Sequence, residues 1–212
     1  MNNTITTVYK FGSEPIVMKD NAALIDAIRQ VVPLADHEEV FVNTLFESYT
    51  LRAGEFFLQV GEVCRYVGFV NQGLLRYYVL DDGEEHTYDF SPENTFTCNY
   101  ESFLNSSPST RFIQAMEDTT LLRISYGHLQ RLYEGLEHGQ QFGRLVAEQL
   151  FVSHLQKLTS FYRDTADQRY DHFLRLFPGL IDRVPQYVVA SYVGIKPQSL
   201  SRIRAQRAGK HY

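Results

Sequence analysis

The sequence predicts an α+β protein: a β-roll of the jelly-roll type with flanking helices, then a long helix, then a small all-α module that ends in a helix-turn-helix. Three observations predict this order. Short runs rich in Val, Phe, Tyr, Leu and Thr alternate with turn residues from Tyr49 to about Ile124. Residues 144–177 contain neither Pro nor Gly. Residues 186–207 have the pattern of helix, tight turn, helix.

The composition is that of an ordinary soluble globular protein, with 44% hydrophobic and 21% charged residues in a chain of 212. No apolar run approaches the roughly 20 residues that span a bilayer, and the N-terminal residues do not resemble a signal peptide. We therefore expect a cytoplasmic protein without a membrane partner. Cys64 and Cys98 do not have the spacing of a metal or iron–sulfur site, so we expect no metal and no cofactor. Two buried thiols are the favoured interpretation, and a disulfide stays open.

Charge is distributed unevenly along the chain. Residues 168–212 hold eight Lys or Arg against two Asp, which gives them a net charge of +6. Since the whole chain has a net charge of −5, residues 1–167 have a net charge of −11. No acidic residue follows Asp182. This asymmetry favours a basic contact module joined to an acidic body, although a solvated basic tail has the same charge pattern.

The N-terminal part predicts an arm and two helices. Residues 1–20 show no periodicity and are interpreted as an arm. Residues 21–31 have the apolar spacing of an amphipathic helix. Residues 36–48 predict a second helix with Val40, Phe41 and Leu45 facing inward. In the strand-rich part, Asp82-Gly83 predicts a tight hairpin turn, since this pair tolerates a positive φ.

Residues 138–163 predict a long helix with two apolar stripes. Such a helix has more apolar surface than one domain usually buries, which favours self-association into a homodimer over packing within one subunit. Thr165 and Gln168 have the spacing of a capping box, so a new helix should begin there. We accordingly predict a β-roll domain over residues 21–163 and a helix-turn-helix domain over residues 164–212.

The segment from Gln186 to Arg207 predicts DNA binding. Ala190 allows two helices to approach closely, Gly194 suits the sharp turn, and Pro197 fits the first turn of the second helix. Arg suits guanine, Gln suits adenine, and Ser and Lys suit phosphates in the major groove. The candidate DNA-binding residues on helix 197–207 and just before it are Lys196, Gln198, Ser199, Ser201, Arg202, Arg204 and Arg207. A helical hairpin used only for protein contacts is the alternative.

At this point the sequence resembles the Crp/Fnr superfamily of bacterial transcription regulators, the cyclic-AMP receptor protein type, over roughly residues 22–206. The resemblance rests on RAGE, on VNQGLLRYYVLDDG, on a long helix after LLRISYGHLQRL, and above all on VPQYVVASYVGIKPQSLSRIR. It implies a cyclic-nucleotide-binding-type β-roll, a dimerisation helix, and a homodimer that reads a near-palindromic operator on double-stranded DNA. It also implies RNA polymerase as a partner.

Two departures from the family pattern are visible. The cyclic-nucleotide cassette is degenerate: Glu93 stands for the ribose-binding Glu, while the resemblance puts Ser109 and Thr110 at the phosphate site and shifts Arg111 by two. Cyclic AMP is thus disfavoured, and a different small-molecule effector or a closed pocket stays open. The second departure is a trimmed winged helix, because residues 177–185 leave little room for a hairpin and few residues follow helix 197–207.

No enzyme is predicted, because the chain has no GxSxG, P-loop or HExxH motif. Two alternatives to a regulator were weighed. A ligand-binding or scaffolding protein of the same fold would use its terminal helices only for association. A cupin-like enzyme would need a His/Glu cluster converging from strands, and only His86 lies in the strand-rich region.

Overall fold

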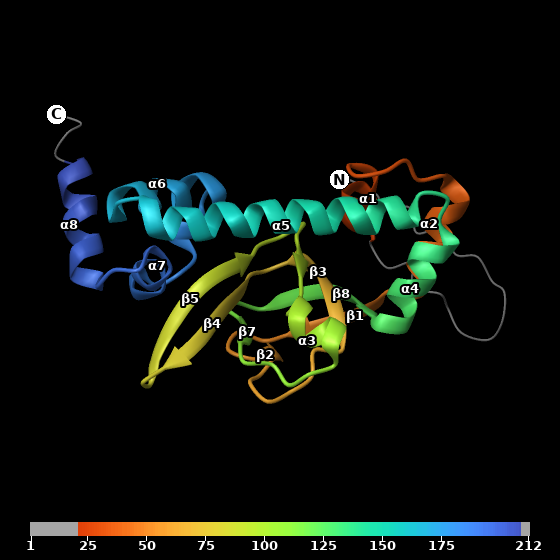
Figure 1. The fold of residues 1–212 in the computed structure, drawn as a ribbon, viewed down its shortest axis with the longest axis horizontal. Coiled ribbons are helices and arrows are strands. Elements are labelled where there is room, and N and C mark those ends of the chain that lie inside the picture. Colours follow the sequence, from red (N-terminus) through yellow and green to blue (C-terminus); the bar gives the residue numbers. More distant parts are fainter. Residues whose placement is uncertain (1–20, 209–212) are drawn as a thin grey trace, which may run out of the picture.

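The computed structural model describes residues 21–208, and the predicted arm over residues 1–20 and the last residues, 209–212, lie outside this range. A long helix, α5 (Gly139–Arg163), runs along the molecule above a β-roll (Figure 1). Helices α1 (Ala22–Arg29), α2 (Asp36–Leu45) and α4 (Tyr126–Gly135) lie at one end of α5, and the C-terminal helices lie at the other. The predicted α+β fold is confirmed.

The β-roll consists of two four-stranded antiparallel sheets. One has the order β1 (Glu47–Leu51), β8 (Thr119–Ser125), β3 (Tyr66–Gln72), β6 (Phe96–Thr97). The other has the order β2 (Phe56–Leu58), β7 (Phe112–Ala115), β4 (Leu75–Asp81), β5 (Glu84–Ser91). A short helix, α3 (Tyr100–Asn105), follows β6. Inward-facing Phe69, Leu75 and Ile113 are completely buried, so alternate strand residues form the core as a jelly roll requires.

The predicted hairpin turn is confirmed at the tip of β4 and β5. Asp82 and Gly83 both have positive φ, 49° and 81°, as a type I′ turn needs. The turn keeps the two strands in register, with Asp81 opposite Glu84. In Figure 1 the tip of the hairpin extends beyond the rest of the sheet and lies below α7, and β5 is an edge strand.

The second helix differs from its prediction in length and in face. It ends at Leu45, and Glu47 already begins β1. Val40 is 66% exposed, so its predicted inward position is wrong, and Val42 is completely buried in its place. The cause is Glu38, whose carboxylate accepts hydrogen bonds from the Ala35 and Glu137 amides and turns its own face of the helix inward. These amides also hold the pKa of Glu38 below its ordinary value.

The apolar side chains of the long helix α5 are exposed along most of its length. Its first turns pack on the roll through Phe142, but the helix then carries a continuous row of half-exposed or exposed apolar side chains: Leu150, Phe151, Val152, Leu155, Leu158, Phe161 and Tyr162. The two predicted apolar stripes are therefore present, and one chain does not cover them. The helix ends at Arg163, and the predicted capping box is confirmed because Thr165 Oγ1 accepts from the Gln168 amide.

The C-terminal helices α6 (Ala166–Leu176), α7 (Gln186–Val193) and α8 (Pro197–Ala208) share one core with the edge of the β-roll. Phe173, Val188, Val189 and Leu200 are completely buried there. A short 3₁₀ turn, η1 (Leu180–Asp182), stands where a hairpin would precede a winged helix. Within residues 164–208 the structure contains no strand.

Candidate nucleic-acid interface and effector cavity

The two helices α7 and α8 form a helix-turn-helix. Gly194 has φ +73°, a left-handed conformation that ends α7, and the Ile195 amide donates to the Ala190 carbonyl across the turn. Pro197 then opens α8, where the missing N–H costs nothing. Ala190 is completely buried where the helices approach, and the completely buried Leu200 anchors α8 from beneath. This packing fixes which face of α8 points outward.

The outer face of α8 carries most of the predicted DNA-binding residues. Lys196, Gln198, Ser201, Arg202 and Arg204 are exposed, and Ser199 is half-buried. Among residues 21–208, no acidic side chain forms an ion pair with any of the three basic residues in this set. The Ser201 hydroxyl accepts from Gln186 Nε2 at 2.7 Å, which ties the start of α7 to α8. Figure 1 shows α8 at the extremity of the molecule, away from the roll.

Arg207 lies differently from the other candidates. Its guanidinium donates to the carboxylates of Asp167 and Asp171 on α6, at 2.8 Å and 2.6 Å, and lies over the Tyr170 ring. These two aspartates raise the pKa of Arg207, Asp171 most of all. Arg207 therefore ties α8 to α6, and a phosphate contact by this residue would have to compete with two carboxylates.

A serine hydroxyl of α7 forms hydrogen bonds with the backbone of the edge strand β5. Ser191 Oγ accepts from the Thr87 amide and donates to the Glu85 carbonyl, both at 2.8 Å. The outer backbone groups of an edge strand have no partner strand, so this side chain satisfies two of them. The helix-turn-helix is in this way attached to the same hairpin that begins at Asp82-Gly83.

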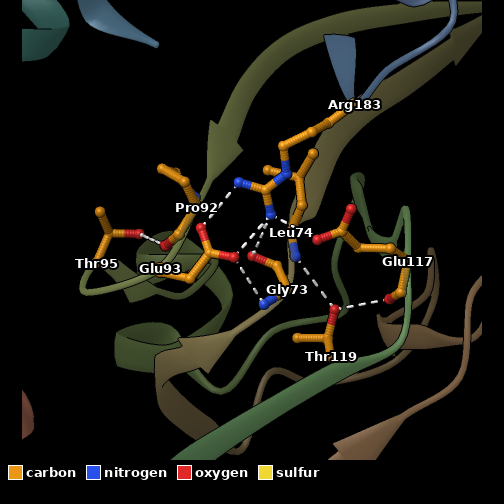
Figure 2. Close-up of polar contacts among 8 residues, drawn as sticks. All are labelled: Gly73, Leu74, Pro92, Glu93, Thr95, Glu117, Thr119 and Arg183. Atoms are coloured by element: carbon orange, nitrogen blue, oxygen red, sulfur yellow. Dashed lines mark hydrogen bonds and ion pairs between the residues drawn. The ribbon is translucent and has the colours of Figure 1, made fainter. Parts of the chain in front are cut away.

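A charged cluster makes the second attachment between the two parts (Figure 2). Arg183, just after η1, donates to both oxygens of Glu93, at 2.9 Å and 2.7 Å, to Glu117 at 2.5 Å and to the Gly73 carbonyl at 3.2 Å. The Gly73 amide in turn donates to Glu93 at 3.0 Å. Arg183 holds the pKa of Glu93 below its ordinary value, and the two carboxylates raise that of Arg183. We call Arg183, Glu93 and Glu117 the clamp.

A cavity of about 410 Å³ lies between the roll, α4 and the first half of α5. Its walls are mainly apolar and include the aromatic residues Tyr77, Tyr88, Phe90, Phe96, Tyr100, Tyr133 and Phe142. Burial raises the pKa of Tyr88 to about 12, so this phenol is neutral and can donate. The closed pocket considered as an alternative is thus not what the structure contains.

Polar side chains stand at the margin of this cavity. Arg111 Nη2 lies 3.1 Å from the Glu101 carboxylate, and its guanidinium lies 5.6 Å from the centre of the Tyr88 ring. Lys157 of α5 pairs with Asp89 of β5 at 2.5 Å. Each cation therefore has a carboxylate partner, and an acidic ligand entering here would exchange one anion for another.

The four predicted ligand residues do not come together. Arg111 lines the cavity, but Glu93 does not, because the clamp holds its carboxylate. Ser109 is buried and structural: its hydroxyl accepts from Asn99 Nδ2 and donates to the Arg111 carbonyl. Thr110 is exposed and is not part of the cavity wall. In this structure Glu93 and Arg111 therefore do not line one common cavity.

A family model for the cyclic nucleotide-binding domain matches residues 49–135. Over these residues the β-roll is similar to a cyclic nucleotide-binding domain. A comparison with curated proteins found no match. Solved structures of similar fold include the catabolite activator protein of Thermus thermophilus, at 18% identity and TM-score 0.53 over 87% of this chain and 88% of that one.

Two more solved structures resemble most of this chain in fold. FixK2 from Bradyrhizobium japonicum has TM-score 0.60 at 18% identity, over 78% of this chain and 86% of that one. A CooA variant from Carboxydothermus hydrogenoformans has TM-score 0.59 at 17% identity, over 86% of this chain and 84% of that one. The fold that the resemblance implied is thereby confirmed. These comparisons indicate no enzyme family.

Two further properties concern the described residues alone. Residues 21–208 include no group of three or more His, Cys, Asp or Glu side chains placed to hold a metal ion. In the same range, none of the helices has both the length and the apolar character needed to cross a membrane.

Sequence reasoning missed the interface between the β-roll and the helix-turn-helix. Phe90 lines the cavity and also packs against Phe173, Phe177 and Tyr192, with ring centres 5.5–6.1 Å apart. Its alternation along β5 could have shown that it points inward, but not that its neighbours come from α6 and α7. Arg183 gave no signal either, because a single basic residue between helices has many possible partners.

Proposed function

We propose that this protein is a DNA-binding transcription regulator that acts as a homodimer and responds to a small molecule in the domain cavity. The observation that carries the proposal is the outer face of α8, where five polar or basic side chains are exposed. Arg and Gln at the N-terminal half of such a helix can make bidentate contacts to guanine and adenine in the major groove. The basic surplus after Asp182 supports backbone binding.

Selection of bound sequences from a random duplex pool tests the proposal directly. We expect a near-palindromic consensus, with affinity that falls steeply as salt rises because bound cations are released from DNA. Arg202→Ala should weaken binding to the consensus by about 1–3 kcal/mol, roughly 5–150-fold, and relax the preference at one base pair.

Arg175→Ala is the matched control, because Arg175 is an exposed arginine of α6 in the same module. It should leave both affinity and consensus in place. Recovery of no consensus, together with equal affinity of the Arg202 and Arg175 variants for DNA, would contradict the regulator proposal. That result would favour the alternative, a ligand-binding or scaffolding protein of the same fold without DNA binding.

The homodimer is proposed to form along α5. Seven apolar side chains of this helix stand exposed in one chain, among them Phe151 at 66% and Leu158 at 55%. A contiguous apolar row of this kind is typical of a protein interface. Leu158→Glu should give a monomer in analytical ultracentrifugation, since it would bury two like charges at a two-fold interface. Val40→Glu, at an exposed valine of α2, should leave the dimer intact.

The effector is proposed to be a small, largely apolar molecule rather than cyclic AMP. The aromatic walls of the cavity support an apolar ligand, and the clamp occupies the glutamate that the nucleotide cassette would need. An effector changes DNA binding only if it binds the two arrangements of the protein with different affinity. RNA polymerase as a partner and action in the cytoplasm follow from the same proposal.

A further inference from the structure

Two thiols meet in the middle of the β-roll. Cys64 precedes β3 and Cys98 follows β6, and their sulfurs lie 3.8 Å apart although the residues are 34 positions apart in the chain. Both are free cysteines. A disulfide has a sulfur–sulfur bond of about 2.05 Å, so the two atoms need to approach by roughly 1.8 Å.

The surroundings of the two sulfurs differ. Cys98 belongs to the wall of the effector cavity, whereas Cys64 borders a separate surface pocket with Glu62, Arg65 and Arg123. The two cysteines therefore border two different pockets. Cys64 is buried and Cys98 is half-buried, which keeps larger thiol reagents away from the pair.

The two thiols also differ in acidity. The hydrogen bond from the Cys98 thiol lowers the pKa of Cys64 to about 7, with a further contribution from the Asn99 backbone. Burial raises the pKa of Cys98 well above its ordinary value. Since the thiolate is the nucleophile, Cys64 is the member of the pair that attacks first, and Cys98 keeps its proton until the second step.

We propose that Cys64 and Cys98 form a reversible intrachain disulfide when the protein meets hydrogen peroxide. The Cys64 thiolate attacks one peroxide oxygen, the O–O bond breaks, and Cys64 sulfenic acid and hydroxide result. The Cys98 sulfur then attacks the Cys64 sulfur, the S–O bond breaks, and the Cys98 proton leaves with the departing oxygen. Two thiols thus give two electrons to one peroxide, and two waters are the products.

The position of the pair connects oxidation to the cavity. The Cys98 amide donates to Tyr77 Oη at 3.1 Å, and this hydroxyl also bonds Thr97 Oγ1 at 2.6 Å and Ser91 Oγ at 3.1 Å. Drawing Cys98 toward Cys64 strains this network, which lines the cavity next to Phe90. An effect of oxidation on DNA binding rests on the proposed function, but formation of the disulfide does not.

Intact-protein mass spectrometry of the full chain, after one equivalent of hydrogen peroxide, is the test. We expect a mass loss of about 2 Da per chain that dithiothreitol reverses. Trypsin should then give a linked pair of peptides, residues 53–65 with residues 77–111, that disappears on reduction. A gain of oxygen atoms on separate cysteines, a disulfide between two chains, or intact thiols under peroxide would each overturn the proposal.

Two variants test the order of the steps. Cys98→Ser keeps a hydroxyl donor beside Cys64 but removes the second thiol, so it should stop at a sulfenic acid, seen in the intact mass as a gain of one oxygen atom. Cys64→Ser leaves only the thiol of raised pKa, so its reaction should be slower on the order of tenfold or more. Equal rates for the two single variants would contradict the assignment of Cys64 as the attacking thiol. The linked peptide pair is measured in the wild-type protein, so that result does not depend on whether either variant folds.

Discussion

Replacing Arg183 by Met removes the charge of the clamp while it keeps most of the apolar stem. Arg183 makes three ion-pair hydrogen bonds to Glu93 and Glu117 and one to the Gly73 carbonyl. Hydrogen bonds to charged groups contribute about 1.5–3 kcal/mol each when buried, but exposed ion pairs contribute about 0–1 kcal/mol. The side chains of Arg183, Glu93 and Glu117 are 32%, 32% and 38% exposed, so solvent screening applies.

We therefore expect a loss of about 1–2 kcal/mol of the free energy that holds the helix-turn-helix on the roll. No buried charge is left behind, since Glu93 still accepts from the Gly73 amide and reaches solvent. This loss raises the population of the undocked module by about 5–30-fold.

Hydrogen exchange monitored by mass spectrometry measures that population, because the Thr87 amide is protected by Ser191 of α7. Exchange at Thr87 and in α7 should accelerate by the same 5–30-fold or so in Arg183→Met, while the inner strands keep their protection. Arg175→Met is the control, at an exposed arginine of α6. Unchanged exchange at Thr87 in the Arg183 variant, or equal acceleration throughout the protein, would refute the clamp as a separate attachment.

Three further predictions concern the same molecule. The pKa of Glu93 is lowered in the folded protein. The contribution of Glu93 to docking of the helix-turn-helix on the roll is therefore full above the unfolded pKa near 4.5 and is lost as pH falls through the folded pKa. Hydrogen exchange at this docking interface, measured between pH 7 and 3, should show the loss. Arg207→Ala should cost about 1 kcal/mol or less in urea unfolding, because its ion pairs with α6 are partly exposed. Gly73→Ala should lower the melting temperature by more than Arg207→Ala does, because φ of Gly73 is +102° and a Cβ would lie 2.7 Å from a backbone carbon of Thr119. A melting temperature equal to that of the wild type would contradict this close contact.

The fold was predictable from the sequence wherever local pattern and tertiary packing agree. Asp82-Gly83 predicts its own turn, and the capping box at Thr165 predicts the start of α6, because both signals lie within four residues. The prediction for α2 was wrong about Val40, since the deciding contact is a hydrogen bond that Glu38 accepts from the amide of Glu137, 99 positions away. A local pattern does not contain such a partner.

The candidate site divides in the same way. The outer face of α8 was predictable because Leu200 and Ile203 determine which side of one short helix is buried. The effector residues were not, because Glu93 pairs with Arg183, 90 positions later. The resemblance supplied a nucleotide-binding role for Glu93 that its actual partner replaces. Arg207 shows the same limit, since its partners on α6 lie 36 and 40 positions earlier.

Phe90 connects the cavity inside the roll with the helices that are proposed to bind DNA. One residue lines the effector cavity and contacts Tyr192 of α7, with ring centres 5.6 Å apart. Because α7 contacts α8 through the buried Leu200, a ligand that moved this ring would act on α8 across two packed layers. Closely packed interfaces rearrange between discrete packing arrangements rather than deforming continuously. The proposed coupling between the cavity and α8 therefore needs only this one shared aromatic cluster. Ser191 and the clamp determine how strongly the docked arrangement is preferred.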